Sequence, residues 1–237
     1  MSLNSHPVAL VDIFHEYGTG NTKVQVLAGI NLQVEPGELL AIMGPSGSGK
    51  STLLAIAGGL ERPTSGKVYI HGESFADMSS VECARVRRKS IGYVFRDSNL
   101  LPTLTAVENV EMPLELDGFS SSKARDAALF ALEEVGALDL AEKFPDDLNG
   151  REQQQVAIAR ALVGRRSIIM ADEPTGSLDS HSGEQIMLAL RQQIDAGAAG
   201  ILATHEACFA AWADRTVFLR DGKMTDTSSS DRIEDLL

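Results

Sequence analysis

Short apolar runs alternate with amphipathic stretches along most of this chain. Residues 8–14 alternate weakly between apolar and polar positions and are predicted to form a strand, followed by one or two strands over 24–34. The uninterrupted apolar run Leu39–Met43 predicts a buried strand. Further strands are predicted over 67–71, 91–95, 168–171 and 201–204, with a hairpin over 217–222.

Helical periodicity separates several of these strands. Apolar positions between 128 and 135 fall on one face of a predicted helix, and Gly136 stands where a left-handed residue would end it. Two more helices are predicted over 152–163 and 182–195. Strands that alternate with helices favour a mostly parallel sheet covered on both faces.

Composition narrows the class of protein. The 237 residues carry a formal net charge of −12, which argues against a general nucleic-acid binder. No apolar run approaches the roughly 20 residues of a membrane-spanning helix, and the polar residues 1–7 lack the apolar core of a secretory signal. Cys83 and Cys208 have neither metal-binding nor disulfide spacing, so a reducing cytosol is the predicted compartment.

The most specific feature is a glycine-rich segment between a predicted strand and a predicted helix. It fits the pattern G-x-x-x-x-G-K-[ST], in which backbone N–H groups at a helix N-terminus cradle the phosphates of a nucleotide. In this pattern Lys50 reaches the outer phosphates and the Ser51 hydroxyl ligates Mg²⁺. The alternative is a chance match of a glycine-rich loop, which the flanking strand and helix oppose. The predicted nucleoside-triphosphate site comprises Gly44, Pro45, Ser46, Gly47, Ser48, Gly49, Lys50, Ser51 and Thr52.

Two other predicted strand ends carry candidate catalytic groups. Asp172 and Glu173 follow the apolar run over 168–171, where an aspartate can hold Mg²⁺ and the next glutamate can polarise the attacking water. An Asp-Glu pair after a strand is common by itself. It becomes a candidate metal and catalytic site because the same sequence also contains a phosphate loop. His205 follows the strand over 201–204, where an imidazole can bond the γ-phosphate, although a lone histidine is usually structural or exposed.

The segment Leu148-Asn-Gly-Arg-Glu-Gln-Gln154 leads directly into a predicted helix. Here the sequence resembles the nucleotide-binding domain of ATP-binding-cassette (ABC) transporters, whose signature L-S-G-G-x-Q precedes such a helix. Blocks over 100–110, 172–180 and 213–222 resemble the subfamily that powers macrolide exporters and lipoprotein-release complexes. The resemblance extends over about 8–224 and implies that ATP is the nucleotide.

The resemblance implies an α/β fold with a P-loop NTPase (RecA-like) core and a mostly parallel sheet. An N-terminal antiparallel β subdomain and an inserted α-helical subdomain complete the expected architecture. A single ABC nucleotide-binding domain is expected over 1–237. Its ATP-binding core is expected over about 8–96 and 159–224, its helical subdomain with the signature over about 97–158, and a polar tail over about 225–237.

The resemblance also implies roles for individual residues. Tyr17 matches the aromatic residue that stacks on adenine, although a surface aromatic at a strand end is the alternative. Glu173 matches the catalytic base and His205 the switch histidine, and Lys50 joins them as a catalytic residue. Asp172 and Ser51 are the expected Mg²⁺ ligands.

A dimer follows from the same resemblance. Two such domains close face to face, so that each ATP lies between the phosphate loop of one chain and Asn149, Gly150 and Arg151 of the other. Asp179, in the segment Ser177-Leu178-Asp179, matches the D-loop that crosses the dimer seam and also contacts the nucleotide site. The implied reaction is ATP hydrolysis, which drives a separate membrane permease.

The predicted permease partner implies where this chain is located in the cell. Its coupling helix would dock near Arg96–Pro102. The chain would be cytoplasmic and peripheral on the inner face of the membrane, held there through the permease. No nucleic-acid partner is expected.

The chain departs from the family pattern at three functional positions. Arg96 replaces a glutamine that supplies an oxygen to Mg²⁺, and a positive charge at ~4 Å from a dication costs about 8 kcal/mol even at an effective dielectric near 20. Arg96 must therefore swing away or pair with phosphate or with an acid such as Asp97. Asn149 replaces a serine and can still donate a hydrogen bond, whereas Arg151 replaces a glycine that lets the backbone approach the partner's γ-phosphate. Gln155, outside the nucleotide site, stands where an arginine is usual.

These departures leave several functions open. The leading hypothesis is a transport-coupled ATPase, slow as a homodimer or paired with a different consensus ATPase, although Arg96, Asn149 and Arg151 can also be harmless sequence drift. A second hypothesis is an ATP-dependent dimerisation or regulatory module with little turnover. A third is an ABC protein of DNA repair or translation, which the single uninterrupted cassette and the net charge of −12 oppose.

Overall fold

The computed structural model describes residues 6–176 and 178–226, and the chain divides into two compact units. One unit combines 1–78 with 199–237, and the other consists of 79–198. Within the described residues, none of the helices combines the length and apolarity that crossing a membrane requires.

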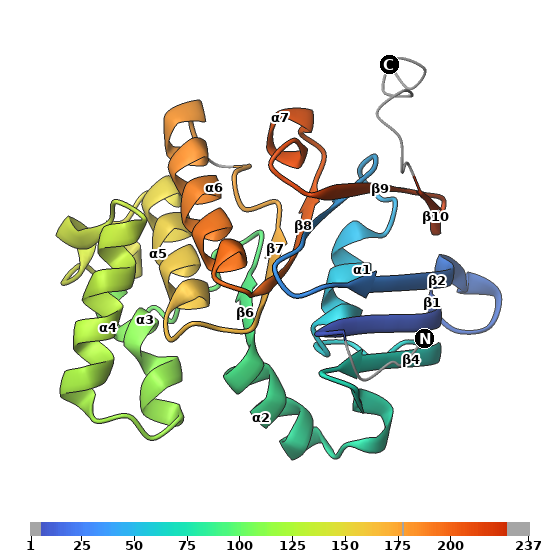
Figure 1. Ribbon diagram of the computed structural model, residues 1–237, viewed down its shortest axis with the longest axis horizontal. Helices are drawn as coiled ribbons and strands as arrows, with labels where there is room; N and C mark the ends of the chain where they lie inside the picture. Colours follow the sequence, from blue (N-terminus) through green and yellow to red (C-terminus); the bar gives the residue numbers. More distant parts are fainter. Residues whose placement is uncertain (1–5, 177, 227–237) are drawn as a thin grey trace. The chain divides into compact units, whose positions relative to one another are not determined.

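The first unit is rich in strands (Figure 1). β2, β1, β4 and β5 form an antiparallel sheet in that order, while β3 lies between β8 and β9 in parallel pairing and β10 pairs antiparallel with β9. The elements of this unit are β1 (Val8–Tyr17), η2 (Gly20–Thr22), β2 (Val24–Val34), β3 (Leu39–Met43), α1 (Lys50–Ala57), β4 (Ser65–Ile70), β5 (Glu73–Ser74), η3 (Phe75–Asp77), β8 (Ala199–Thr204), α7 (Ala207–Ala210), β9 (Arg215–Arg220) and β10 (Lys223–Asp226).

Strand β3 is buried because it has a neighbour on each side. Leu40, Ala41 and Ile42 have no accessible surface, as the uninterrupted apolar run predicted. In the register with β8, Met43 lies opposite Thr204, so both strands end at one edge of the sheet. The segments that follow these strands begin at that edge, which is where the phosphate loop starts.

The second unit is mainly helical. In Figure 1 helices α3, α4 and α5 lie side by side, and they pack against one another. Strands β6 and β7 pair in parallel. The elements of this unit are α2 (Ser80–Ser90), β6 (Ile91–Val94), α3 (Ala106–Leu116), α4 (Ser121–Glu134), η4 (Leu138–Leu140), η5 (Pro145–Asp147), α5 (Gly150–Leu162), β7 (Ile168–Asp172) and α6 (Ser180–Asp195).

Helix ends in this unit follow the chemistry of their capping residues. Gly136 has a φ of 67°, and the N–H groups of Gly136 and Ala137 donate to the carbonyls of Glu133 and Leu132, which closes α4 as predicted. Helices α2 and α3 were not among the elements predicted individually. Both begin at capping boxes, with Ser79 and Thr105 as the N-cap residues, and this S/T-x-x-E pattern is the signal that could have revealed them.

The α/β fold class is confirmed, with parallel strands, an antiparallel N-terminal sheet and a helical region. The region predicted over 24–34 is one strand rather than two, and the strand predicted over 67–71 begins earlier, at Ser65, and ends at Ile70. His71 lies outside that strand, in the turn that leads to β5, and its φ is 49°. The tail predicted over about 225–237 lies outside the described residues beyond 226.

Candidate active site

The phosphate loop connects β3 to α1 and depends on glycine at its first position. A Cβ on Gly44 would lie 2.2 Å from the backbone oxygen of Leu219 in β9, so no larger residue fits without moving the backbone. Gly49 has a φ of 102° and immediately precedes α1. The loop is therefore shaped by backbone constraints, as the sequence pattern predicted.

The first turn of α1 is left without a side-chain cap. Gly49 is its N-cap residue and has no side chain that could accept a hydrogen bond from the first N–H groups of the helix. These N–H groups and the helix dipole make the loop a site for an anion. The Ser48 hydroxyl is buried and has no hydrogen-bond partner among the described residues, which also fits a ligand with several acceptor oxygens.

The side chains of the loop fit a polyphosphate and a cation. Lys50 is 7% exposed, and its Nζ donates to the carbonyls of Gly44 at 2.7 Å and Pro45 at 3.3 Å. The Lys50 side chain thus folds back over the loop, where its ammonium group could form a charge-assisted hydrogen bond with a phosphate. Ser51 is exposed in the first turn of α1, so its hydroxyl is accessible to a metal ion. The exposed Pro45, Ser46 and Gly47, together with Thr52 in α1, complete the predicted set.

Tyr17 is the last residue of β1 and is 43% exposed, in keeping with either of its predicted roles. Its hydroxyl donates to Glu61 Oε2 at 2.7 Å and lies 3.4 Å from Thr52 Oγ1. Burial, partly offset by the hydrogen bond with Thr52, raises the pKa of the Tyr17 phenol above its usual value of 10.0. The structure therefore brings this aromatic ring to the end of the phosphate loop.

His205 follows β8 and is exposed. Because Met43 and Thr204 are opposite one another in the parallel pair, His205 and Gly44 leave the sheet from the same edge. In the first unit the structure thus gathers Tyr17, the phosphate loop and this histidine.

Asp172 is the last residue of β7 in the second unit, and Glu173 follows it directly. Asp172 is 7% exposed and Glu173 is 8% exposed. Glu173 has a φ of 48°, a conformation that costs a residue with a side chain about 1–3 kcal/mol and that often marks a functional position. Burial, followed by the charge of Asp172, raises the pKa of nearby Tyr93 far above its usual value, so Tyr93 stays neutral beside this carboxylate.

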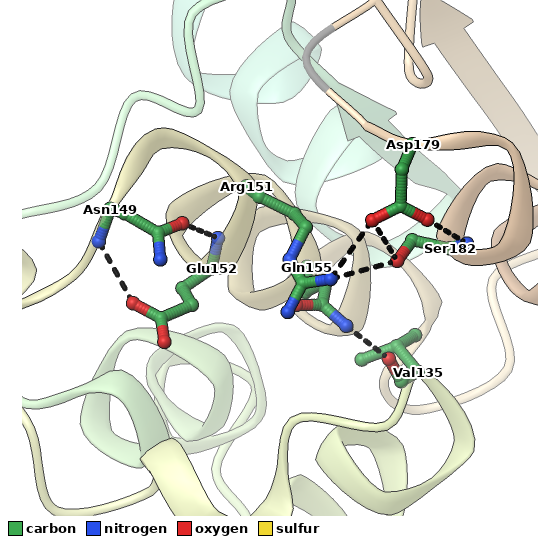
Figure 2. Close-up of polar contacts among 7 residues, drawn as sticks. All are labelled: Val135, Asn149, Arg151, Glu152, Gln155, Asp179 and Ser182. Atoms are coloured by element: carbon green, nitrogen blue, oxygen red, sulfur yellow. Dashed lines mark hydrogen bonds and ion pairs between the residues drawn. The ribbon is translucent and has the colours of Figure 1, made fainter.

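The signature residues form the N-terminus of α5 (Figure 2). Asn149 is the N-cap, and its side-chain oxygen accepts from the Glu152 N–H at 3.0 Å while Glu152 Oε2 accepts from the Asn149 N–H at 2.8 Å. Gly150 is the first helical residue, and nothing lies within 4 Å of the position that a Cβ would take. Replacing serine by asparagine therefore preserves the cap of the helix.

Arg151 is tied to the D-loop of its own chain. Figure 2 shows its guanidinium directed toward Asp179 and Ser182, and Nη1 donates to Asp179 Oδ2 at 3.0 Å and to Ser182 Oγ at 3.2 Å. Asp179 is also the N-cap of α6, where Oδ1 accepts from the Ser182 N–H at 2.9 Å. The hydrogen bond from Ser182 and that from Arg151 together lower the pKa of Asp179. Ser177 of the predicted D-loop lies outside the described residues.

The other two residues that differ from the family pattern are Gln155 and Arg96. Gln155 is 5% exposed and donates to the Val135 carbonyl at 2.9 Å, so it satisfies the backbone near the end of α4 (Figure 2). Arg96 is exposed after β6 and makes no ion pair with any described residue, Asp97 included.

Two residues of α5 that sequence reasoning missed hold the segment after β6. Gln154 donates to the Phe95 carbonyl at 3.2 Å and accepts from the Ser98 hydroxyl at 3.0 Å. Arg160 donates to the carbonyls of Asn99 at 2.7 Å and Ser98 at 2.8 Å. No local pattern in the sequence announces these contacts, which link residues about sixty positions apart along the chain.

Comparison with known proteins identifies the family. Residues 27–176 match the family model described as ABC transporter. An uncharacterized ABC transporter ATP-binding protein of Methanocaldococcus jannaschii, MJ1508, is 45% identical over 215 residues, which cover 91% of this chain and 96% of that protein. The solved dimeric structure of MJ0796, a bacterial ABC transporter cassette, has a TM-score of 0.89 at 39% identity and covers 94% of this chain and 99% of that one.

Two export proteins are also similar. The pyoverdine export ATP-binding/permease protein PvdT of Pseudomonas aeruginosa is 43% identical over 96% of this chain, and the macrolide export ATP-binding/permease protein MacB of Shigella sonnei is 43% identical over 91% of it. The chain spans only 35% and 33% of the length of these relatives. The chain belongs to the ABC transporter family and has the fold of its ATPase cassettes.

Proposed function

We propose that this protein binds ATP at Gly44–Thr52 and hydrolyses it to drive a membrane permease. The observation that carries the proposal is the N-terminus of α1, where the N-cap is a glycine without a side chain, behind a loop that only glycine can form at position 44. Family membership supports it, as does the similarity to a cassette solved in a post-hydrolysis state with ADP and phosphate.

The side chains have complementary roles in this proposal. Lys50 and the N–H groups of α1 neutralise the outer phosphates, and His205 contacts the γ-phosphate. Ser51 and Asp172 would hold Mg²⁺, which would neutralise negative charge on the phosphates. Glu173 orients the water that attacks the γ-phosphorus and accepts a proton from it. The bond between the γ-phosphorus and the β–γ bridging oxygen breaks at the same time, and ADP leaves.

The permease would bind the segment Arg96–Pro102. Several of its residues are exposed, Leu101 among them at 43%. Its backbone is held by hydrogen bonds to the side chains of Asn109 and Arg160. Asn109 accepts from the Leu101 N–H at 2.8 Å and donates to its carbonyl at 3.1 Å. A rigid backbone with an accessible apolar side chain suits a docking surface. The ATPase would thereby sit at the inner face of the cell membrane, with a second ABC ATPase chain as its dimer partner.

The hydrolytic role is tested with Glu173→Gln, which keeps the shape of the side chain and removes its basicity. We expect phosphate release to fall about 10²- to 10⁴-fold while ATP affinity is retained, because general base catalysis is lost and binding is not. The exposed Glu184 offers a matched control, since Glu184→Gln removes the same charge elsewhere in the second unit. Equal turnover in Glu173→Gln and wild type would overturn the proposed role of Glu173.

We further propose that the altered signature lowers turnover of the homodimer. Arg151 is engaged by Asp179 within its own chain, and its side chain takes the place of a residue that in the family lets the backbone approach a partner's phosphate. The same contact favours the second candidate, an ATP-dependent dimerisation module with little turnover. Buried Asp172 and Glu173 favour hydrolysis instead. Single-turnover hydrolysis separates the two, because only an ATPase converts its bound ATP to ADP.

A combined variant tests the signature directly. Arg96→Gln, Asn149→Ser and Arg151→Gly together restore the family residues, and we expect steady-state ATP hydrolysis to rise about tenfold, equivalent to about 1.4 kcal/mol in the barrier. A combined variant no faster than wild type would mean that these residues do not limit the reaction.

A further inference from the structure

The hydroxyl of Tyr17 is held between two neighbours in the first unit. It donates to Glu61 Oε2 at 2.7 Å and lies 3.4 Å from Thr52 Oγ1. A phenol has a single proton to donate, and the shorter contact with the carboxylate takes it. Thr52 is then the donor in the longer contact. The ring is thus fixed at its far end to the glutamate and to a residue of the phosphate-loop motif.

Glu61 also lies close to a buried histidine. Its Oε1 lies 3.2 Å from Nε2 of His15, a residue that is 6% exposed, while the Glu61 side chain is 33% exposed. The His15 ring also meets the Tyr17 ring edge-on, with centroids 4.6 Å apart and planes at 81°. Because the pKa of the Tyr17 phenol is raised, the hydroxyl stays protonated and donates at neutral pH.

The backbone around Tyr17 is fixed by the same neighbourhood. The N–H of Glu16 donates to the Thr64 hydroxyl at 3.0 Å, so the connection between α1 and β4 holds this strand end through Glu61 and Thr64. Gly18 turns the chain away with a φ of 84°, and a Cβ there would lie 2.4 Å from the Thr22 carbonyl oxygen. Tyr17 nevertheless remains 43% exposed. The ring is therefore oriented in advance and still accessible to a ligand.

We propose that Glu61 is a positioning residue for recognition of the nucleotide base, because it holds the Tyr17 ring in the orientation that stacks on a base. The inference rests on the proposed function, in which the phosphates of the same nucleotide lie in the loop that contains Thr52. An ordered ring lowers the entropy lost when the base binds, which is how a residue that never touches the nucleotide raises affinity. The alternative is that the Glu61–Tyr17 contact only fastens β1 to the end of α1.

The experiment compares ATP with inorganic tripolyphosphate, which has the phosphates and lacks the base. We expect Glu61→Ala to weaken ATP binding about fivefold and to leave tripolyphosphate binding unchanged, as one lost hydrogen bond predicts. Glu61→Gln keeps an acceptor oxygen and should restore most of the affinity. Glu16→Gln is the matched control, because Glu16 pairs with Lys23 at 2.9 Å on the same strand and does not contact the Tyr17 hydroxyl.

A double-mutant cycle adds a second readout. Tyr17→Phe keeps the ring and removes the hydroxyl, so Tyr17→Phe combined with Glu61→Ala should be about as weak as either single variant. Losses that multiply, or equal losses for ATP and tripolyphosphate, would overturn the inference and indicate a structural role. Wild-type protein that binds neither ligand would instead overturn the proposed nucleotide site.

Discussion

Helices α1 and α5 both begin at residues to which the sequence assigns nucleotide binding, and their first turns differ in what occupies them. At α1 the N-cap is Gly49, which has no side chain to cap the helix. At α5 the N-cap Asn149 accepts from a backbone N–H, and Arg151 projects from the first turn to Asp179. One helix end is open to a ligand, and the other is satisfied by its own side chains.

The positive N-terminal end of a helix can be left available for an anion, as at α1, or occupied by side chains of the protein, as at α5. An anion is favoured there, whereas a cation such as the Arg151 guanidinium is disfavoured by about 0.3–1 kcal/mol. Asp179 offsets this cost by pairing with Arg151. Function at α1 should therefore depend on backbone shape, and function at α5 on which side chains are present.

The largest effect is expected for Gly44→Ala in the phosphate loop. The added Cβ would lie 2.2 Å from the Leu219 backbone oxygen, so the loop must deform. We expect ATP affinity, measured by isothermal titration calorimetry, to fall at least about a hundredfold. Gly47→Ala is the control, because nothing lies within 4 Å of its Cβ position and only the left-handed φ of 81° opposes the substitution. We expect no more than about a tenfold loss there, and wild-type affinity in Gly44→Ala would contradict the backbone argument.

A smaller effect is expected for Arg151→Gly in a Glu173→Gln background, where ATP persists. Removing the side chain frees the first turn of α5 for a partner's phosphate, so ATP-dependent dimerisation should tighten about tenfold by light scattering. Arg165→Gly is a matched control, since Arg165 is exposed, lies in the same unit and has a φ of 52° that suits glycine. Equal dimerisation of Arg151→Gly and the control would show that the Arg151 side chain does not oppose ATP-dependent dimerisation.

The ion pair between Arg151 and Asp179 should make stability depend on pH. The pKa of Asp179 is lowered from its ordinary value of 3.8, so its charge stabilises the fold above about that pH and ceases to do so as pH falls through the lowered folded value. Asp179→Asn keeps a helix cap and removes the charge. We expect its Tm at pH 7 to be lower by about 1–3 °C, with the difference vanishing in strong acid. The same difference persisting in an Arg151→Gly background would rule out the pair as its source.

The smallest effect is expected for Gly150→Ala at the start of α5. A Cβ there meets nothing within 4 Å and φ is not in the left-handed region, so the substitution should stabilise the helix by about 0.5 kcal/mol in urea unfolding. The ATP affinity of the single chain should not change, because the signature serves a partner's nucleotide in the proposed dimer. A destabilised Gly150→Ala would mean that this helix end is as constrained as Gly44.

Much of the fold was predictable where the determinants are local. The strand, glycine loop and helix over 39–57 occupy nearly the predicted residues, because apolar runs and glycine conformations act within a few residues. The end of α4 at Gly136 was predictable for the same reason. Helix α3 was harder, since Pro113 within it argues against a helix in the sequence pattern while the cap at Thr105 argues for one.

The sequence by itself determined the phosphate loop, the acidic strand end at Asp172 and the position of the signature, because each is written in contiguous residues. Tertiary structure alone decided which side chains those residues meet. Tyr17 meets Glu61 across 44 positions of the chain, and Arg151 meets Asp179 across 28. A charged or hydroxyl side chain has many possible partners in a sequence, and only the packing of strands and helices selects one of them.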